Sequence, residues 1–319
     1  MRHLALSLSI ASLLAFAPGA NTASGQEATK DTATVYFTRH ISPKGLKAVY
    51  QAMHWTPTDK VAVKVSTGEP PSSNYLRPEL IEEVVKAVKG TIVECNTAYG
   101  GPRSRTDSHR EVAKKHGFTR IADVDIQDAD GSTTLKVTDG EVLKQNYVGS
   151  HFGNYGSYLV ISHFKGHQMA GFGGAIKNIS IGIASAKGKA WIHSGGTSER
   201  NPWGGRQEAF LKAMAEAGKS VSDAMGQGKR MAYINVMNRL SIDCDCDGHP
   251  AEPDIHDIGV LASTDPVALD QACMDLIDKA EGNESFVKRV ANRDGMLTVR
   301  HADKLGLGTR VYKLVLIDE

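Results

Sequence analysis

Short apolar runs alternate with longer amphipathic segments along most of the chain. The apolar runs are rich in β-branched residues and predict strands at 33–37, 60–65, 91–95, 158–163, 232–237, 259–263 and 313–318. Between them, apolar positions recur with helical spacing over 43–53, 77–90, 106–117, 206–226 and 265–280. Strands that alternate with amphipathic helices predict an α/β protein. We expect a largely parallel sheet with helices on both faces, divided into one or two lobes.

The first 25 residues do not follow this alternation. A basic start at Arg2 and His3 is followed by an apolar stretch from Leu4 to Phe16 and then by small residues, which is typical of a secretory signal peptide. An uncleaved N-terminal helix is the alternative. The stretch is shorter than the roughly 20 apolar residues of a membrane span, so we expect no membrane anchor after cleavage. The sequence thus predicts an exported protein of a bacterial periplasm.

The remaining residues, 26–319, are predicted to form the α/β domain, with any boundary between two lobes near 195–230. The whole chain of 319 residues is 41% hydrophobic and 23% charged, with a formal net charge of +1. Such a balance favours a soluble globular protein and gives no strong field for nucleic acid or an anionic membrane. Composition does not indicate the oligomeric state.

In parallel sheets, ligands bind beyond the carboxyl ends of the strands. The loops after Cys95, Ser162, Met237 and Ser263 are therefore the first candidates for a site. In the first of them, Arg103 precedes a predicted helix and is a candidate to bind a carboxylate or phosphate. A capped helix with solvated arginines is the alternative, and Cys95 reads as a small buried residue.

The loop after Met237 contains "DCDCDGHPAEPDIHD", in which Cys244, Cys246 and His249 lie close together. Thiolates and imidazoles favour a transition metal such as nickel, zinc or iron. A polar turn and oxidation of the two cysteines are the alternatives. The chain has no Cys-x-x-Cys-x-x-Cys run, so no ferredoxin-type cluster is expected.

The loop after Ser162 reads "SHFKGHQMAGFGGAIKNISIG" and combines ligand side chains with little bulk. Its glycines, among them Gly171, Gly173 and Gly174, allow close approach to the backbone, and Lys177 adds a positive charge. This loop predicts a cradle for an anion or cofactor, with a tight structural turn as the alternative. His167 and His163 are the candidates for acid–base catalysis here, since histidine titrates near neutral pH. Further along, Asp265 is predicted to cap a helix, with Asp270 in its exposed first turn.

Four segments resemble the uncharacterised DUF362 family: "ECNTAYGG", residues 162–185, residues 243–273 and "GLGTR". More distantly, "HQMAGFGGAIKNISIG" is similar to the glycine–lysine segment of the nickel-dependent lactate racemase family. That resemblance implies a nickel pincer nucleotide bound covalently to a lysine, which corresponds to Lys177. It also implies that His167 is a catalytic histidine and His193 a metal ligand.

Two hypotheses follow. The chain is an exported metal- or cofactor-binding protein that acts as an enzyme on a small anionic molecule through the His/Lys glycine-rich loop. Alternatively, it is a non-catalytic periplasmic metal-binding or redox protein that uses Cys244, Cys246 and His249. In both cases the expected partner is a small anionic ligand or a metal ion.

Overall fold

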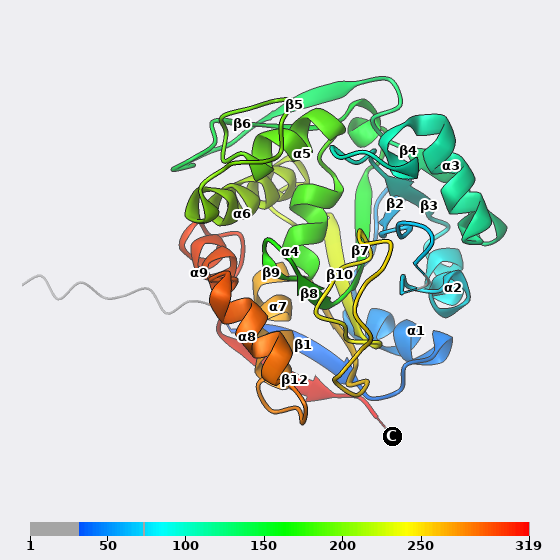
Figure 1. Ribbon diagram of the computed structural model, residues 1–319. Helices are drawn as coiled ribbons and strands as arrows, with labels where there is room; N and C mark the ends of the chain where they lie inside the picture. The colour runs from blue at the N-terminus through cyan, green and yellow to red at the C-terminus, as the bar shows by residue number, and fades with distance from the viewer. Residues whose placement is uncertain (1–31, 73, 319) are drawn as a thin grey trace, which may run out of the picture. The chain divides into compact units, whose positions relative to one another are not determined.

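The computed structural model describes residues 32–72 and 74–318, and the predicted signal peptide lies outside them (Figure 1). The strands are β1 (Ala33–Thr38), β2 (Val61–Lys64), β3 (Thr91–Glu94), β4 (Val124–Ile126), β5 (Ser132–Lys136), β6 (Gln145–Gly149), β7 (Ser157–His163), β8 (Lys165–His167), β9 (Gly171–Gly173), β10 (Met231–Met237), β11 (Gly259–Ser263) and β12 (Tyr312–Leu316). The helices are α1 (Pro43–Ala52), α2 (Pro78–Ala87), α3 (Thr106–Lys115), α4 (Ala175–Lys177), α5 (Ala186–His193), α6 (Gln207–Ala224), α7 (Pro266–Ile277), α8 (Glu284–Asn292) and α9 (Met296–Lys304).

The main sheet has the strand order β12-β1-β11-β10-β7-β2-β3-β4. Its neighbouring strands are parallel except at β11, which is antiparallel to both β1 and β10. The predicted α/β fold with a largely parallel sheet is therefore confirmed. The direction of β11 corrects one expectation, because its carboxyl end at Ser263 lies opposite Tyr233, near the start of β10. The loop after Ser263 consequently lies at the far edge from the loop after Met237.

Helices cover both faces of this sheet (Figure 1). Helices α1, α2 and α3 pack on one face, where Leu46, Ile81 and Ala113 share a buried cluster with strand residues such as Val63 and Ile234. On the other face, α4 and α7 join strand residues of β7 and β10 in a second apolar cluster. The central strands β2, β7, β10 and β11 are buried along their whole length, as expected for strands that lie between two helical layers.

Residues Asp31–Glu319 form one compact unit. The range 195–230, where the sequence allowed for a boundary, contains α6, which packs against α5 and α9 within this unit. Among the described residues, no helix is both long enough and apolar enough to cross a membrane.

Helix boundaries follow local chemistry. Ser42 caps α1 by accepting a hydrogen bond from the backbone nitrogen of Gly45, and proline occupies the first position of α1, α2 and α7. Asp265 caps α7 by accepting from the backbone nitrogens of Val267 and Ala268, as predicted. Asp270, expected to be exposed, is instead buried, with 1% of its surface accessible. The next section shows what it binds.

Candidate functional site

A pocket with a cavity volume of about 120 Å³ lies at the carboxyl edge of the parallel strands. The ends of β2, β3 and β7, the hairpin β8–β9, helix α4 and the loop after β10 all contribute to its wall. Its charged, sulfur-containing and imidazole side chains are Lys64, Glu94, Cys95, Arg103, His163, Lys165, His167, Lys177, Lys189, His193, Cys244, Asp245 and Cys246. Three of the four loops selected from the sequence therefore meet at this pocket.

Buried Asp270 fixes the loop that carries Lys177. Its carboxylate accepts hydrogen bonds from the backbone nitrogens of Ala175 and Ile176, at 2.7 and 3.0 Å, and from the side chain of Asn235. A Cβ atom on Gly174 would come within 2.3 Å of Asp270 Oδ1, so only glycine permits this approach. The nitrogens expected to cradle an anion are thus occupied by a carboxylate of the protein. These hydrogen bonds position Lys177, and an anion in the pocket would have to be bound by side chains.

The other glycines of the loop differ in position. Gly173 and Gly174 line the pocket. Gly171 has φ of +82° and lies against the backbone of Gly295, where an added Cβ would be 3.0 Å from the Gly295 Cα. Gly171 therefore shapes the hairpin. Of these three glycines, only Gly173 and Gly174 line the pocket.

The amine of Lys177 reaches the pocket without a partner of its own. Within residues 32–72 and 74–318, no side chain or carbonyl forms a hydrogen bond or ion pair with it. Burial, together with the neighbouring ammonium of Lys165, lowers the pKa of Lys177 to about 7. A substantial fraction of this lysine is therefore a neutral amine near pH 7, and a neutral amine is a nucleophile and a base.

His193 presents a lone pair to the pocket. Its Nδ1 donates a hydrogen bond to the carbonyl oxygen of Lys189 at 2.7 Å, and its ring stacks on Phe210. Because Nδ1 carries the hydrogen, the Nε2 of the neutral ring is an acceptor. Burial lowers the pKa of His193 to about 4, although the bond to Lys189 opposes this shift. A neutral ring held in this way suits a metal ligand or a hydrogen-bond acceptor.

His167 differs from His193 in the nitrogen that it presents to the pocket. Its Nδ1 accepts hydrogen bonds from the backbone nitrogens of Met169 and Ala170, at 3.2 and 2.9 Å. Burial, reinforced by the charge of Lys177, holds the pKa of His167 well below its usual value. The neutral ring must therefore carry its hydrogen on Nε2, which lies 4.0 Å from the Sγ of Cys246. His167 offers the pocket a hydrogen-bond donor.

His163 is held on both sides. Its Nδ1 lies 2.9 Å from Asp245 Oδ1 and its Nε2 lies 2.6 Å from the carbonyl oxygen of Asn238. Both ring nitrogens face acceptors, so neither offers a lone pair to a ligand. Lys165 also pairs with Asp245, at 2.9 Å. His163 thus holds the loop after β10 through Asp245 and Asn238, and its catalytic role stays a prediction.

The two cysteines of that loop, Cys244 and Cys246, form a disulfide. With His167, their ligand atoms lie within 4.8 Å of one another, and this group could hold a metal ion. In the form described, however, the two sulfur atoms bond to each other and Nε2 of His167 carries a hydrogen. Metal binding here would require reduction of the disulfide and removal of that hydrogen.

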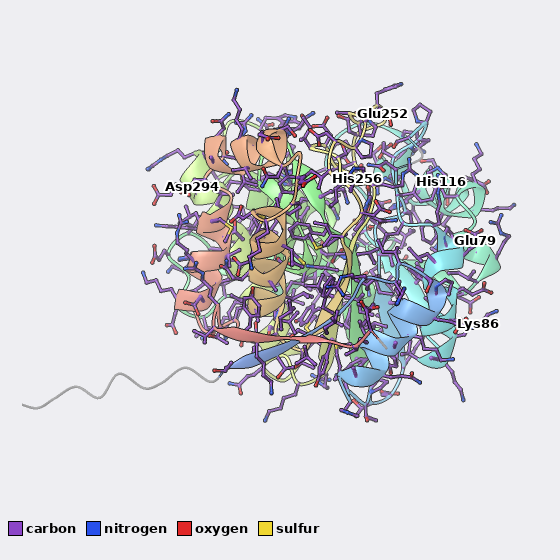
Figure 2. The ribbon with its side chains drawn as sticks, turned by 90° about the horizontal axis from the view of Figure 1, so that it is seen from below. Glu79, Lys86, His116, Glu252, His256 and Asp294 are labelled. Atoms are coloured by element: carbon purple, nitrogen blue, oxygen red, sulfur yellow. A yellow bond between two sulfur atoms is a disulfide. The ribbon has the colours of Figure 1, made fainter. Side chains whose placement is uncertain are left out.

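The predicted cluster of Cys244, Cys246 and His249 is not assembled. The histidine beside the two cysteines is His167 in place of His249. His249 is exposed and does not belong to the group formed with His167. Glu252 and His256, further along the same loop, are also exposed (Figure 2), whereas Ile255 is buried in the apolar core. His193 lines the pocket but is also outside this group.

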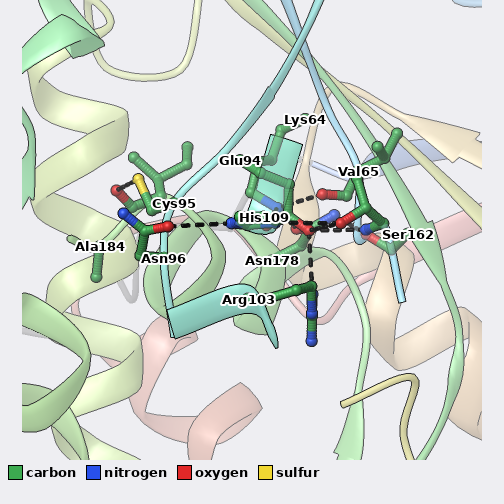
Figure 3. A network of polar contacts seen from close by, with 12 residues as sticks. Lys64, Val65, Glu94, Cys95, Asn96, Arg103, His109, Ser162, Asn178 and Ala184 are labelled. Carbon is green, nitrogen blue, oxygen red and sulfur yellow. Dashed lines mark hydrogen bonds and ion pairs between the residues drawn. The ribbon is translucent and has the colours of Figure 1, made fainter. Parts of the chain in front are cut away.

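Glu94 is the centre of a buried polar network beside the pocket (Figure 3). Lys64 lies 3.4 Å from its Oε2, Arg103 lies 3.4 Å from its Oε1, and the backbone nitrogen of Thr67 donates to it. Burial alone would raise the pKa of Glu94, but these two cations outweigh burial and lower it to about 2. Arg103 also binds Glu69 at 2.8 Å. Its guanidinium is thus neutralised by the protein, which leaves less of its charge for a ligand.

Several contributors to the site were not selected from the sequence. Lys64 lies inside a strand, Lys189 inside a helix and Asp270 in what reads as an exposed turn. The polar residue within the apolar run "KVAVKV" was the only signal for Lys64. Across the pocket, five basic side chains (Lys64, Arg103, Lys165, Lys177 and Lys189) face two carboxylates (Glu94 and Asp245). Cys95, as expected, is a buried thiol, whose pKa is raised to about 12 by burial.

Comparison with known proteins identifies the family. Residues 61–275 match the model of DUF362, described as a domain of unknown function. The chain belongs to the DUF362 family. This confirms the resemblance carried by the four sequence segments. No curated protein matches the chain.

Solved structures show more distant similarity to this DUF362 protein. The lactate racemase apoprotein from Thermoanaerobacterium thermosaccharolyticum aligns with a TM-score of 0.46 and 14% identity, covering 77% of this chain and 57% of that one. A protein from Thermotoga maritima aligns with a TM-score of 0.41 and 12% identity, covering 82% of this chain and 58% of that one. This DUF362 chain therefore spans less than two thirds of either structure's length.

Proposed function

We propose that this DUF362 protein is an enzyme that binds a small anionic carbonyl compound and reacts with it through Lys177. The observation that carries the proposal is the arrangement around the partnerless amine. Lys177 shares one pocket with two neutral histidines whose pocket-facing nitrogens are opposite in character, a donor on His167 and an acceptor on His193. Such a set can bind, polarise and attack one small molecule.

The charge of the pocket supports an anionic ligand. Lys64 and Arg103 share Glu94, Arg103 also pairs with Glu69, and Lys165 pairs with Asp245. Among the described residues, Lys189 donates to backbone carbonyls, including that of Cys95, and Lys177 has no partner. The uncompensated positive charge is therefore centred on Lys189 and on the protonated fraction of Lys177, where it can attract a carboxylate.

The roles follow from protonation. The neutral amine of Lys177 adds to the carbonyl carbon, and loss of water forms a C=N bond. The Nε2 hydrogen of His167 stabilises the negative charge that develops on the carbonyl oxygen during addition. The Nε2 lone pair of His193 accepts a hydrogen bond from the bound molecule and orients it. Asp270 acts only indirectly, by holding the helix start that carries Lys177.

The same residues fit the cofactor implied by the distant resemblance. A nickel pincer nucleotide needs an amine for covalent attachment and a histidine lone pair for the metal, and Lys177 and His193 provide these groups. When bound, it would supply a metal centre and an electrophilic ring. The contribution of the chain itself would be the attachment point, the metal ligand and a positively charged wall.

Export remains part of the proposal. The predicted signal peptide supports it, and a disulfide such as Cys244–Cys246 persists in oxidising compartments.

The test combines native mass and chemical trapping. The protein is isolated without chelator, and its intact mass, peptide map and metal content are recorded. The unmodified protein is then incubated with glyoxylate or pyruvate and reduced with borohydride. We expect added mass on the Lys177 peptide, either as isolated or after trapping, and its loss in Lys177→Ala.

Two comparisons make the result specific. Lys288→Ala removes an exposed lysine on α8 and should leave the adduct unchanged. Acetone, a neutral carbonyl compound, should give much less adduct than the two anions. Absence of any Lys177 modification, as isolated and after trapping, would overturn the proposal.

A further inference from the structure

The pocket contains a second reactive group that the proposed function does not use, the Cys244–Cys246 disulfide. Both cysteines line the pocket wall. Cys246 is partly accessible, whereas Cys95 and Cys273 are buried free thiols. A reagent small enough to enter the pocket can therefore reach this disulfide. Cys273 is not part of the pocket lining. Cys95 lines the pocket but is only 1% accessible, and burial raises its pKa to about 12, so its thiol stays protonated.

A purely structural role does not account for this bond. By the chain-entropy argument, a disulfide stabilises a fold more when it closes a longer loop, and this one encloses a single residue, Asp245. The turn is also anchored without it. Asp245 binds Lys165 and His163 through its side chain, and its carbonyl oxygen accepts from the backbone nitrogen of Glu69 at 2.7 Å. Breaking the disulfide would leave both sulfur atoms in the pocket.

The surroundings of the disulfide favour thiolate chemistry. The Nε2 of His167 lies 4.0 Å from Cys246 Sγ and carries the hydrogen, so it can donate to a thiolate at that position. The excess of positive charge around Lys177 and Lys189 also stabilises a thiolate. Cys246 is therefore the better leaving group. Cys244 is only 6% accessible but lines the pocket wall, and it is the sulfur to be attacked.

We propose that Cys244–Cys246 is a redox centre that undergoes thiol–disulfide exchange with a low-molecular-weight thiol bearing a carboxylate. This inference stands on the sulfur pair and His167, and it goes beyond the proposed function at Lys177. The carboxylate of the thiol is drawn by the same positive charge that would bind other small anions.

The exchange balances in two steps. The thiol loses its proton to water, and its thiolate attacks Cys244, so that a mixed disulfide forms as the Cys244–Cys246 bond breaks. Cys246 leaves as a thiolate that accepts a hydrogen bond from His167. A second thiolate attacks the small-molecule sulfur of the mixed disulfide and releases a symmetrical disulfide. Two thiols are oxidised, and the protein disulfide is reduced to two cysteine thiols, which take up two protons.

The experiment measures the reduction rate of the folded wild-type protein by three thiols. Mercaptoacetate, 2-mercaptoethanol and cysteamine carry negative, zero and positive charge. Each rate is divided by the rate at which the same thiol reduces the neutral 2-hydroxyethyl disulfide, which removes differences in thiolate fraction and nucleophilicity. Samples are quenched with acid, alkylated and mapped by mass spectrometry. We expect mercaptoacetate to react about ten-fold faster than cysteamine, because the pocket favours an anion. Cys95 and Cys273 should stay unlabelled while the protein is folded.

Two histidine variants test whether His167 in particular assists the exchange. His167→Ala should slow reduction by mercaptoacetate about ten-fold, since the leaving thiolate loses its donor. His249→Ala changes an exposed histidine on the loop that carries the two cysteines, and it should not change the rate. Equal rates for all three thiols, or a disulfide that resists reduction in the folded protein, would overturn the proposal.

A further variant distinguishes this inference from the proposed function. Cys244→Ser with Cys246→Ser removes the redox centre and should leave adduct formation at Lys177 intact. Failure of exchange with a normal Lys177 adduct would reject only the redox centre, and the reverse result would reject only the lysine chemistry.

Discussion

The carboxylate of Asp270 lies 2.7 Å from the backbone nitrogen of Ala175, beneath the short helix that ends at Lys177. Asp270 thus accepts hydrogen bonds from the first backbone nitrogens of α4, as a capping side chain does at the start of a surface helix. Because it comes from α7, which packs on the same face of the sheet as α4, it ties the reactive loop to a neighbouring helix.

Replacing Asp270 should loosen this loop. Asp270→Asn keeps the shape but loses the charge that accepts two backbone hydrogen bonds, so we expect the free energy of unfolding to fall by about 2 kcal/mol. Denaturant unfolding measures this change. Asp278→Asn, at the far end of α7, is the control and should have little effect. Equal stability of Asp270→Asn and wild type would show that the carboxylate does not support the loop.

Lys177 should react with electrophiles at unusually low pH. Because its pKa is about 7, its acylation rate should reach half of its maximum near neutral pH. The exposed Lys288 is the reference residue, and Lys177 should gain its reactivity at lower pH than this reference. Competitive labelling with acetic anhydride, read peptide by peptide, compares the two residues in one sample. A Lys177 labelling rate that still rises steeply above pH 8 would show that its pKa is not lowered.

Glu94 should make the fold sensitive to acid. Its pKa is about 2 in the folded protein and near 4.5 in the unfolded chain, so its stabilising contribution is present above pH 4.5 and is lost as the pH falls towards 2. Glu94→Gln should therefore destabilise the protein by about 3–5 kcal/mol at pH 7, because Lys64 keeps an unneutralised buried charge and Arg103 retains only Glu69 as its partner. The difference from wild type should shrink below pH 4.

Unfolding curves at pH 7 and pH 3 test this prediction for Glu94. Glu79→Gln, which breaks an exposed pair with Arg120, should change stability by less than about 1 kcal/mol at either pH. A Glu94→Gln variant as stable as wild type at pH 7 would contradict the network.

Trp203 should report on ligand binding. It lines the pocket mouth, and 57% of its surface is exposed. A ligand that enters the pocket should change the polarity around its indole and shift its fluorescence. Trp55 and Trp191, the other two tryptophans, hydrogen-bond to backbone carbonyls outside the pocket. The signal should disappear in Trp203→Phe. A signal that persists in this variant would place the ligand elsewhere.

Much of the fold could be predicted from the sequence, because it depends on periodicity. The seven predicted strands all occur in the main sheet, and the five predicted helices lie within a few residues of their expected ends. The direction of β11 could not be predicted, since a short apolar run carries no signal for the orientation of its partner. The hairpin β8–β9 was also missed, because its glycines resemble those of a loop.

The location of the site was predictable and its detailed roles were not. His167, Lys177 and Cys246 meet because strand ends share one edge of the sheet. Which histidine nitrogen carries a hydrogen depends on backbone groups such as the nitrogen of Ala170 and the carbonyl of Lys189. Those partners come from local chain geometry, which residue type and spacing do not encode.

The pairing of β1 between β11 and β12 bears on how much of the chain must be kept in a shortened protein. The family match spans 61–275 and leaves out β1, α1, α8, α9 and β12. A fragment with those limits would expose the edge of β11 that pairs with β1, and all five residues of β11 are buried in the intact chain. Unpaired apolar strand edges promote aggregation. We therefore expect that a soluble fragment must extend beyond residues 61–275 at both ends.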